Sequence, residues 1–157
     1  MPTRRRILAL LTLPLASPGH AAEDPRALPG DLYAADPHSG LALDGLDPVS
    51  YFLDPTSPRA GDPALELGHA GLVWRFAGRG NREAFRADPE TYVPRIGGYD
   101  PVGAARGRVV NADPRIAALI DGRLYLFRVP EGRERALSDP AMLAEAEARW
   151  PQLKAGR

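Results

Sequence analysis

The sequence predicts an α+β fold, a small single domain of short β-hairpins and short helices. Three features lead to this class: short strand-like segments that follow tight-turn residues, aspartate-proline pairs typical of helix starts, and an ordered agreement between the two halves of the chain. Strands and helices that are all short and interspersed favour an α+β arrangement over a barrel or a helix bundle.

The strand signal is strongest in two segments. Leu72–Phe76 and residues 124–127 are rich in aromatic and branched side chains, and they follow Gly71 and Asp121-Gly122 respectively. An Asp-Gly pair between apolar runs is a strong hairpin-turn signal. We also expect shorter strands at residues 41–43, 64–67 and 109–110.

The helix signal comes from proline. Nine of the 17 prolines follow an aspartate, as Pro48 follows Asp47 and Pro114 follows Asp113. Aspartate accepts hydrogen bonds from the free N–H groups of a first helical turn, and proline fits the first helical position. Several of these pairs should therefore start helices. The expected helices are residues 81–87, 89–93, 131–137 and 140–150, the last with an apolar face.

The two halves of the chain echo one another. Residues 45–49 are matched by residues 98–102 at an offset of 53, and five later positions from Phe76 to Pro89 recur from Phe127 to Pro140 at an offset of 51. Either a few common residues coincide by chance, or two similar units pack around a shared core, which we favour.

The N-terminus has the layout of a secretory signal peptide. Arg4, Arg5 and Arg6 precede ten mostly apolar residues, and small residues follow. We predict a signal peptide at residues 1–21, cleaved after Ala21, with Ala22 as second choice, and a periplasmic or secreted mature protein. The arginines fit either the Sec or the twin-arginine route. Residues 22–40, rich in proline, aspartate and glycine, are predicted to be a linker or an N-terminal arm.

Composition narrows the functions of the mature chain. Losing the three leader arginines from 20 basic residues leaves 17 against 20 acidic ones, a net charge of −3. This balance argues against nucleic acid as a partner. The chain has no cysteine, which excludes disulfides and thiol redox chemistry. No apolar stretch beyond the leader approaches spanning length, so we expect no transmembrane span in the mature chain.

The motifs of this chain resemble those of the YHS domain family. YHS modules have D-P-V-C-G-M, aromatic-F-C-S-x-x-C-R-x-x-F and D-P-E-x-Y, which correspond to residues 47–49, 74–85 and 88–92. A longer exported branch, with G-Y-D-P-V-A-Y-F, G-G-Y-C, D-G-x-L-Y-L and N-W-P, is closer still. Its motifs correspond to residues 45–52, 97–100, 121–126 and 149–151. The resemblance implies a YHS-like domain at residues 41–153.

The departures from the family pattern concern its cysteines. Ser50, Ala77 and Asn81 occupy the three cysteine positions, and Asp100 stands where the exported branch has the cysteine of G-G-Y-C. In the second half the equivalent positions hold Gly103, Arg128 and Gly132. YHS modules are linked to heavy-metal binding, but Cu(I) selects thiolate and thioether ligands. The resemblance therefore implies the scaffold and not a thiolate-bound metal.

A metal site without thiolates would use histidine and carboxylate. His38 and His69, with Asp47 and Asp100, are the candidate ligands for a divalent metal, zinc or copper. The alternative is that both histidines are ordinary turn residues, since they lie 31 positions apart with no spaced ligand pair. The two aspartates are equally explained as helix caps.

A ligand or partner face is expected around the central glycine pair. Its candidate residues are Tyr51, Trp74, Gly97, Gly98, Tyr99 and Asp100. Paired glycines permit close backbone approach, although the aromatics could instead be core and the loop a tight turn between the units.

No catalytic motif occurs: there is no G-x-S-x-G elbow, no H-E-x-x-H and no phosphate loop. We therefore expect an exported, non-enzymatic YHS-like binding domain whose partner is an unknown small ligand or periplasmic protein. The alternative is a periplasmic protein that binds copper or zinc for metal homeostasis.

Overall fold

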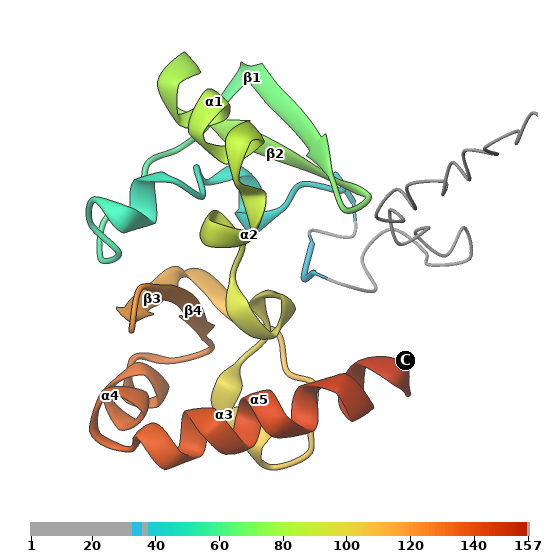
Figure 1. Ribbon diagram of the computed structural model, residues 1–157, viewed down its shortest axis with the longest axis vertical. Helices are drawn as coiled ribbons and strands as arrows, with labels where there is room; N and C mark the ends of the chain where they lie inside the picture. The colour runs from blue at the N-terminus through green and yellow to red at the C-terminus, as the bar shows by residue number, and fades with distance from the viewer. Residues whose placement is uncertain (1–32, 36–37, 157) are drawn as a thin grey trace, which may run out of the picture.

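The computed structural model describes residues 33–35 and 38–156, and the predicted signal peptide lies outside them, as does most of the predicted arm. The fold is the α+β class that the sequence predicts, with two β-hairpins that are each followed by short helices (Figure 1). The first hairpin and its helices are β1 (Asp62–His69), β2 (Leu72–Phe76), α1 (Arg79–Ala87) and α2 (Pro89–Tyr92). The later elements are α3 (Pro101–Ala105), β3 (Asp113–Ile120), β4 (Arg123–Phe127), α4 (Pro130–Ser138) and α5 (Pro140–Ala155).

Two similar units are present, which we define as the first unit (residues 41–92) and the second unit (residues 94–155). Both hairpins turn through two residues with positive φ, Ala70-Gly71 (50° and 75°) and Asp121-Gly122 (51° and 71°). Both are antiparallel, and both carry a register shift just after the aspartate that opens the hairpin. Each of these features recurs at the offset of 51 that the sequence indicates.

The turn that opens each unit is also repeated. Residues 43–45 have φ values of 55°, 52° and 79°, and residues 96–98 have 55°, 60° and 78°. An added Cβ would meet side chains at equivalent positions: Leu41 and Arg75 around Gly45, and Pro94 and Leu126 around Gly98. Positive φ is costly for leucine and more so for branched isoleucine. Two strained turns of the same form indicate a constraint shared by the units.

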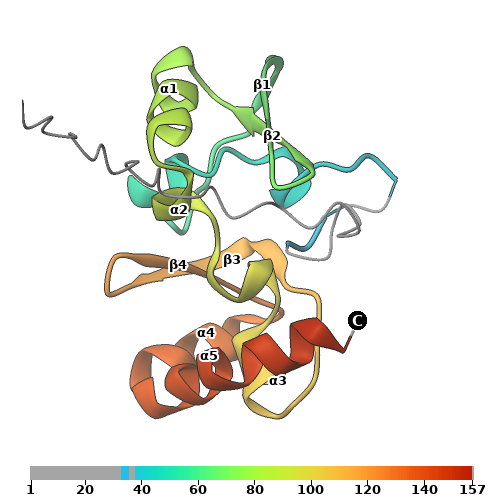
Figure 2. The same ribbon diagram turned by 45° about the vertical axis from the view of Figure 1, so that its right-hand side comes forward.

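The second hairpin forms the middle layer of the molecule. Figure 2 shows β3 and β4 between the first unit and the layer of α3, α4 and α5. Alternate residues of this hairpin enter two different cores: Leu124 and Leu126 pack with the first unit, whereas Tyr125 and Phe127 pack with the helices. Side chains of successive strand residues point to opposite faces, so one hairpin can serve both cores.

The first hairpin has only one buried face, and its sequence shows why. The positions equivalent to Ala117 and Leu126 hold Glu66 and Arg75, whose side chains pair across the hairpin at 2.9 Å. Charged residues there suit a face that meets water, whereas apolar residues on the second hairpin suit a face that meets the first unit. The two faces therefore carry different sequences within one shared backbone plan.

Some local expectations were wrong. Residues 109–110 form no strand, and residues 41–43 make only isolated bridges before a 3₁₀ turn at Leu43–Gly45. Asp113-Pro114 opens a strand and not a helix: Asp113 pairs with Phe127 of β4, and its carboxylate accepts the N–H of Arg115 in a local turn. By contrast, Asp-Pro pairs do start α2, α3 and α5.

The described part of the arm packs on both units. The N–H of Ala34 donates to the carbonyl of Gly97 at 2.6 Å, and Ala35 bridges to Ala42. The ring of Tyr33 meets Trp74 edge-on, with centroids 5.7 Å apart. Within residues 33–35 and 38–156 no helix is long and apolar enough to cross a membrane.

The contrast between the two hairpin faces gives a stability prediction. Leu126→Ala removes a nearly fully buried side chain from the core between the units and should cost about 2–5 kcal/mol in the free energy of unfolding. Arg75→Ala, at the equivalent position, should cost less than about 1 kcal/mol because its ion pair is partly exposed. Urea unfolding of both variants measures the difference; equal losses would contradict the layered arrangement.

Candidate functional site

Asp47 is fully buried, and its carboxylate holds three separate parts of the first unit together. One oxygen accepts the N–H of Val49 at 2.9 Å. The other accepts the N–H of Ala77 at 2.8 Å and the side-chain amide of Asn81 at 2.6 Å. A buried carboxylate needs such donors to offset its desolvation. Asp47 thus joins the D-P-V turn to the end of β2 and the start of α1.

The three positions at which YHS modules carry cysteine all gather around Asp47. Ala77 and Asn81 donate to its carboxylate, as described above. The hydroxyl of Ser50 donates to the carbonyl of Asp47 at 2.7 Å and accepts the N–H of Arg59 at 2.9 Å. This region is thus a hydrogen-bond network without any thiolate. Both carboxylate oxygens of Asp47 accept hydrogen bonds that hold the fold together.

Asp100 has the same role in the second unit. Its side chain accepts the N–H of Gly103 at 2.9 Å, capping α3, and the N–H of Arg128 at 3.3 Å, just beyond β4. An added Cβ at Gly132, the counterpart of Asn81, would lie 3.8 Å from the same carboxylate. We call Asp47 and Asp100, with these donors, the aspartate clamps. The predicted helix-cap role is confirmed for Asp100. Capping is only part of the role, because each clamp aspartate also accepts the backbone N–H of the residue just beyond a strand, Ala77 after β2 and Arg128 after β4.

The predicted aromatic face is mostly core. Tyr51 is fully buried, and its hydroxyl donates to the carbonyl of Pro114 at 2.8 Å. Burial raises the pKa of Tyr51 well above its ordinary value. Trp74 is buried and donates its indole N–H to the carbonyl of His69 at 3.0 Å. These two side chains stabilise the fold and do not form a surface for a ligand.

The predicted metal ligands do not form a group. His38 is exposed, and His69 is half-buried with its ring edge-on to Phe85, at a centroid distance of 5.6 Å. The Nε2 atom of His69 is buried and has no hydrogen-bond partner among the described residues. In the described part of the chain, no three histidine, aspartate or glutamate side chains lie together in a way that could hold a metal ion.

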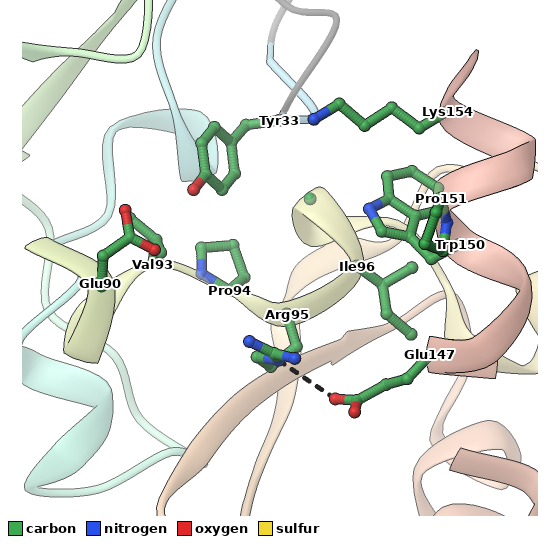
Figure 3. Close-up of a pocket in the computed structure, with 11 residues that line it drawn as sticks. Tyr33, Glu90, Val93, Pro94, Arg95, Ile96, Glu147, Trp150, Pro151 and Lys154 are labelled. Carbon is green, nitrogen blue, oxygen red and sulfur yellow. Dashed lines mark hydrogen bonds and ion pairs between the residues drawn. The ribbon is translucent and has the colours of Figure 1, made fainter. Parts of the chain in front are cut away.

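A groove of about 260 Å³ lies where the two units meet, and we call it the seam groove (Figure 3). It is built by Tyr33 of the arm, by residues 93–97 and by one face of α5. Figure 3 shows Tyr33 and Glu90 on one side, Trp150 and Pro151 on the other, and Pro94 and Ile96 between them. The described residues that line it are Tyr33, Glu90, Val93, Pro94, Arg95, Ile96, Gly97, Glu147, Trp150, Pro151 and Lys154.

The central glycine loop contributes to this groove only in part. Gly97 lines the seam groove, whereas Gly98 lines a separate hollow of about 210 Å³. Tyr99 is buried and its ring packs at a tilt against Trp150, with ring centroids 5.4 Å apart. Asp100 is buried in its clamp. Sequence reasoning missed Arg95, Glu147 and Lys154, since nothing local distinguishes them from other surface charges.

Glu147 is the polar centre of the groove's lower end. One of its oxygens accepts the hydroxyl of Tyr125 at 2.6 Å and the Nε of Arg95 at 3.1 Å, and the other faces Arg123 at 3.4 Å. Burial opposes ionisation of Glu147, but these hydrogen bonds and the two arginine charges hold its pKa below its ordinary value. Burial and the bond to Glu147 raise the pKa of Tyr125.

Comparison with known proteins identifies no relative: no family model, no curated protein and no solved structure matches this chain. The resemblance to the YHS family therefore stays a prediction that rests on the motifs quoted above. The function has to be argued from the clamps and the seam groove themselves.

The first clamp should be essential for folding. In Asp47→Asn an amide nitrogen must face at least one N–H donor, so we expect a loss of about 2–4 kcal/mol in the free energy of unfolding. Asp54→Asn is the control, since Asp54 is exposed and bonded only within its own turn, and it should cost less than about 1 kcal/mol. A clamp variant no less stable than this control would show that Asp47 holds nothing together.

The Glu147 cluster should make stability depend on pH. Because the folded-state pKa lies below the ordinary 4.5, the contribution is full above that pH and is lost as pH falls through the folded pKa. Glu147→Gln should therefore cost about 1 kcal/mol near pH 7, and the difference from wild type should shrink progressively as pH falls below 4.5. Urea unfolding at neutral and at acidic pH measures this.

The matched control for this test is Glu145→Gln on the same helix, whose pair with Arg149 is exposed. Its cost should stay below about 0.5 kcal/mol at either pH. A Glu147→Gln cost that did not change with pH would contradict the role assigned to this carboxylate.

Proposed function

We propose that this chain is an exported, non-enzymatic binding domain that holds a small ligand in the seam groove. The observation that carries the proposal is the groove itself. Segments far apart in the sequence, Tyr33, residues 93–97 and α5, converge there on a hollow with aromatic walls and charged groups. Binding sites combine apolar walls with a few placed polar groups in this way.

The size of the groove favours a compact ligand. Sites for drug-sized molecules usually occupy roughly 300–1,000 Å³, and the seam groove, at about 260 Å³, lies just below that range. Trp150 is only partly buried although the ring of Tyr99 packs against it at a tilt, so part of its ring is left for a ligand. A flat molecule of one ring suits this space.

The proposal that the domain is not an enzyme rests on the carboxylates, which are already hydrogen-bonded within the protein. Asp47 and Asp100, the pair that could have acted as two carboxylates, are bound to backbone N–H groups in their clamps. Glu147 is held by Tyr125 and two arginines. The exported part rests on the predicted signal peptide at residues 1–21. The resemblance to the exported YHS branch supports both parts.

The two tryptophans allow a direct test of binding. Their indole N–H signals can be followed by NMR in the full-length mature protein while benzoate, benzamide and benzylamine are added up to about 10 mM, a range suited to millimolar Kd. At least one probe should shift the Trp150 signal and leave that of Trp74, which is 1% exposed, in place.

Trp150→Leu provides the matched control, because it removes the groove wall while the Trp74 signal still reports on the fold. The same probe should then bind at least about tenfold more weakly, as judged from groove backbone amides. If none of the three probes shifts Trp150, or if Trp74 moves equally, the seam groove is not a ligand site.

A further inference from the structure

We propose that the ligand of the seam groove is a small organic anion, a single carboxylate on a flat apolar body. This inference rests on the proposed function and names the class of ligand that the groove selects. It follows from which hydrogen-bond donors and acceptors of the groove are already used, and from the balance of charge around it.

The acceptors at the lower end of the groove are occupied. Both oxygens of Glu147 face donors within the protein, namely the Tyr125 hydroxyl and the side chains of Arg95 and Arg123. Releasing this carboxylate for a ligand cation would break hydrogen bonds to charged groups, which are stronger than those between neutral groups. Glu147 is therefore a poor anchor for an ammonium group.

The donors, in contrast, are in excess. A guanidinium has five N–H donors, and Arg95 spends its Nε on Glu147 with the Tyr125 hydroxyl as its other neighbour. Lys154 has three more, and within the described residues no ion pair joins it. Figure 3 shows the Arg95 guanidinium at the foot of the groove and the Lys154 side chain reaching across its top toward Tyr33. Groups that can only donate favour a ligand that accepts.

The net charge around the groove sets the charge of the ligand. The lining itself holds two cations, Arg95 and Lys154, and two carboxylates, Glu90 and Glu147. Arg123 lies outside the lining but pairs with Glu147, so the cluster of Glu147 with its two arginines has one positive charge in excess. A monoanion would neutralise it. A second anionic group is disfavoured by Glu90, which lies on the Tyr33 side of the groove and, after burial, is the main cause that raises the pKa of Tyr33.

The apolar body of the ligand would lie between Tyr33 and Trp150. These rings stand on opposite sides of the groove, with Pro94 and Ile96 between them. Aromatic side chains contribute apolar contact together with a preferred stacking geometry. One carboxylate-bearing ring would thus reach the donors of Arg95 or Lys154 while its flat body remains between the walls.

The three probes of the binding test separate this inference from the proposed function. Benzoate, benzamide and benzylamine share one ring and differ in charge. Benzoate should bind at least about tenfold more tightly than the other two, and added salt should weaken only benzoate binding. If benzamide or benzylamine binds as well as benzoate, the groove remains a binding site but the ligand class is wrong. If none binds, the proposed function itself fails.

Lys154→Met tests the cation directly, because methionine keeps an unbranched apolar side chain without the charge. We expect about fivefold to tenfold weaker benzoate binding and unchanged benzamide binding. Arg79→Met, which removes an exposed charge from α1 in the first unit, should leave both affinities unchanged. Benzoate affinity that survives Lys154→Met and the double variant with Arg95→Met would overturn the inference.

Discussion

The aspartate clamp is the interaction on which the rest of this structure depends. In each unit a turn of three residues with positive φ is followed, after one intervening residue, by the clamp residue, Asp47 or Asp100. The carboxylate then bonds backbone N–H groups at the far end of a hairpin, Ala77 or Arg128, about thirty residues away. Turns of this kind are strained and persist only where surrounding contacts hold them. A charged hydrogen bond between distant segments supplies that hold, and it does so without cysteine.

The same backbone plan serves different surroundings because side chains alternate along a strand. Equivalent faces of the two hairpins pack on the helices of their own units, with Trp74 and Phe76 corresponding to Tyr125 and Phe127. The opposite faces differ: one carries the Glu66–Arg75 pair, and the other carries alanine and leucine. The face with the Glu66–Arg75 pair is the outer face of the first unit, because charged side chains oppose burial against a further unit. A few outward positions thus distinguish the outer face of the first unit from the face that lies between the two units.

Much of this arrangement could be predicted from the sequence, since local signals act over a few residues. Gly71 and Asp121-Gly122 mark both hairpin turns, and the Asp-Pro pairs at 88, 100 and 139 mark helix starts. The strand at Asp113–Ile120 was largely missed. Its residues that face away from the helices are apolar because they pack on the first unit, so the sequence does not show the apolar-polar alternation typical of a half-buried strand. The seam groove was missed for a similar reason. Arg95 and Glu147 lie 52 positions apart, and only tertiary packing brings them together.

The groove forms where the repeat breaks down. The helix α2 stops at Tyr92 because Val93 precedes a proline, which disfavours helical φ and ψ, and Val93 is indeed extended. At the offset of 51 that relates α2 to α5, Pro94 corresponds to Glu145, and α5 continues past this position to Ala155, so it is 16 residues long where α2 has four. Glu147, Trp150 and Lys154 all stand on this additional length, opposite the connecting residues that Pro94 forces out of a helix. Pro94 thus separates α2 from the second unit and supplies one side of the groove, while α5, which continues through the matching position and also accommodates Pro151, supplies the other. Duplicated parts of this chain maintain the fold, and its unduplicated part is where a ligand site has room to arise.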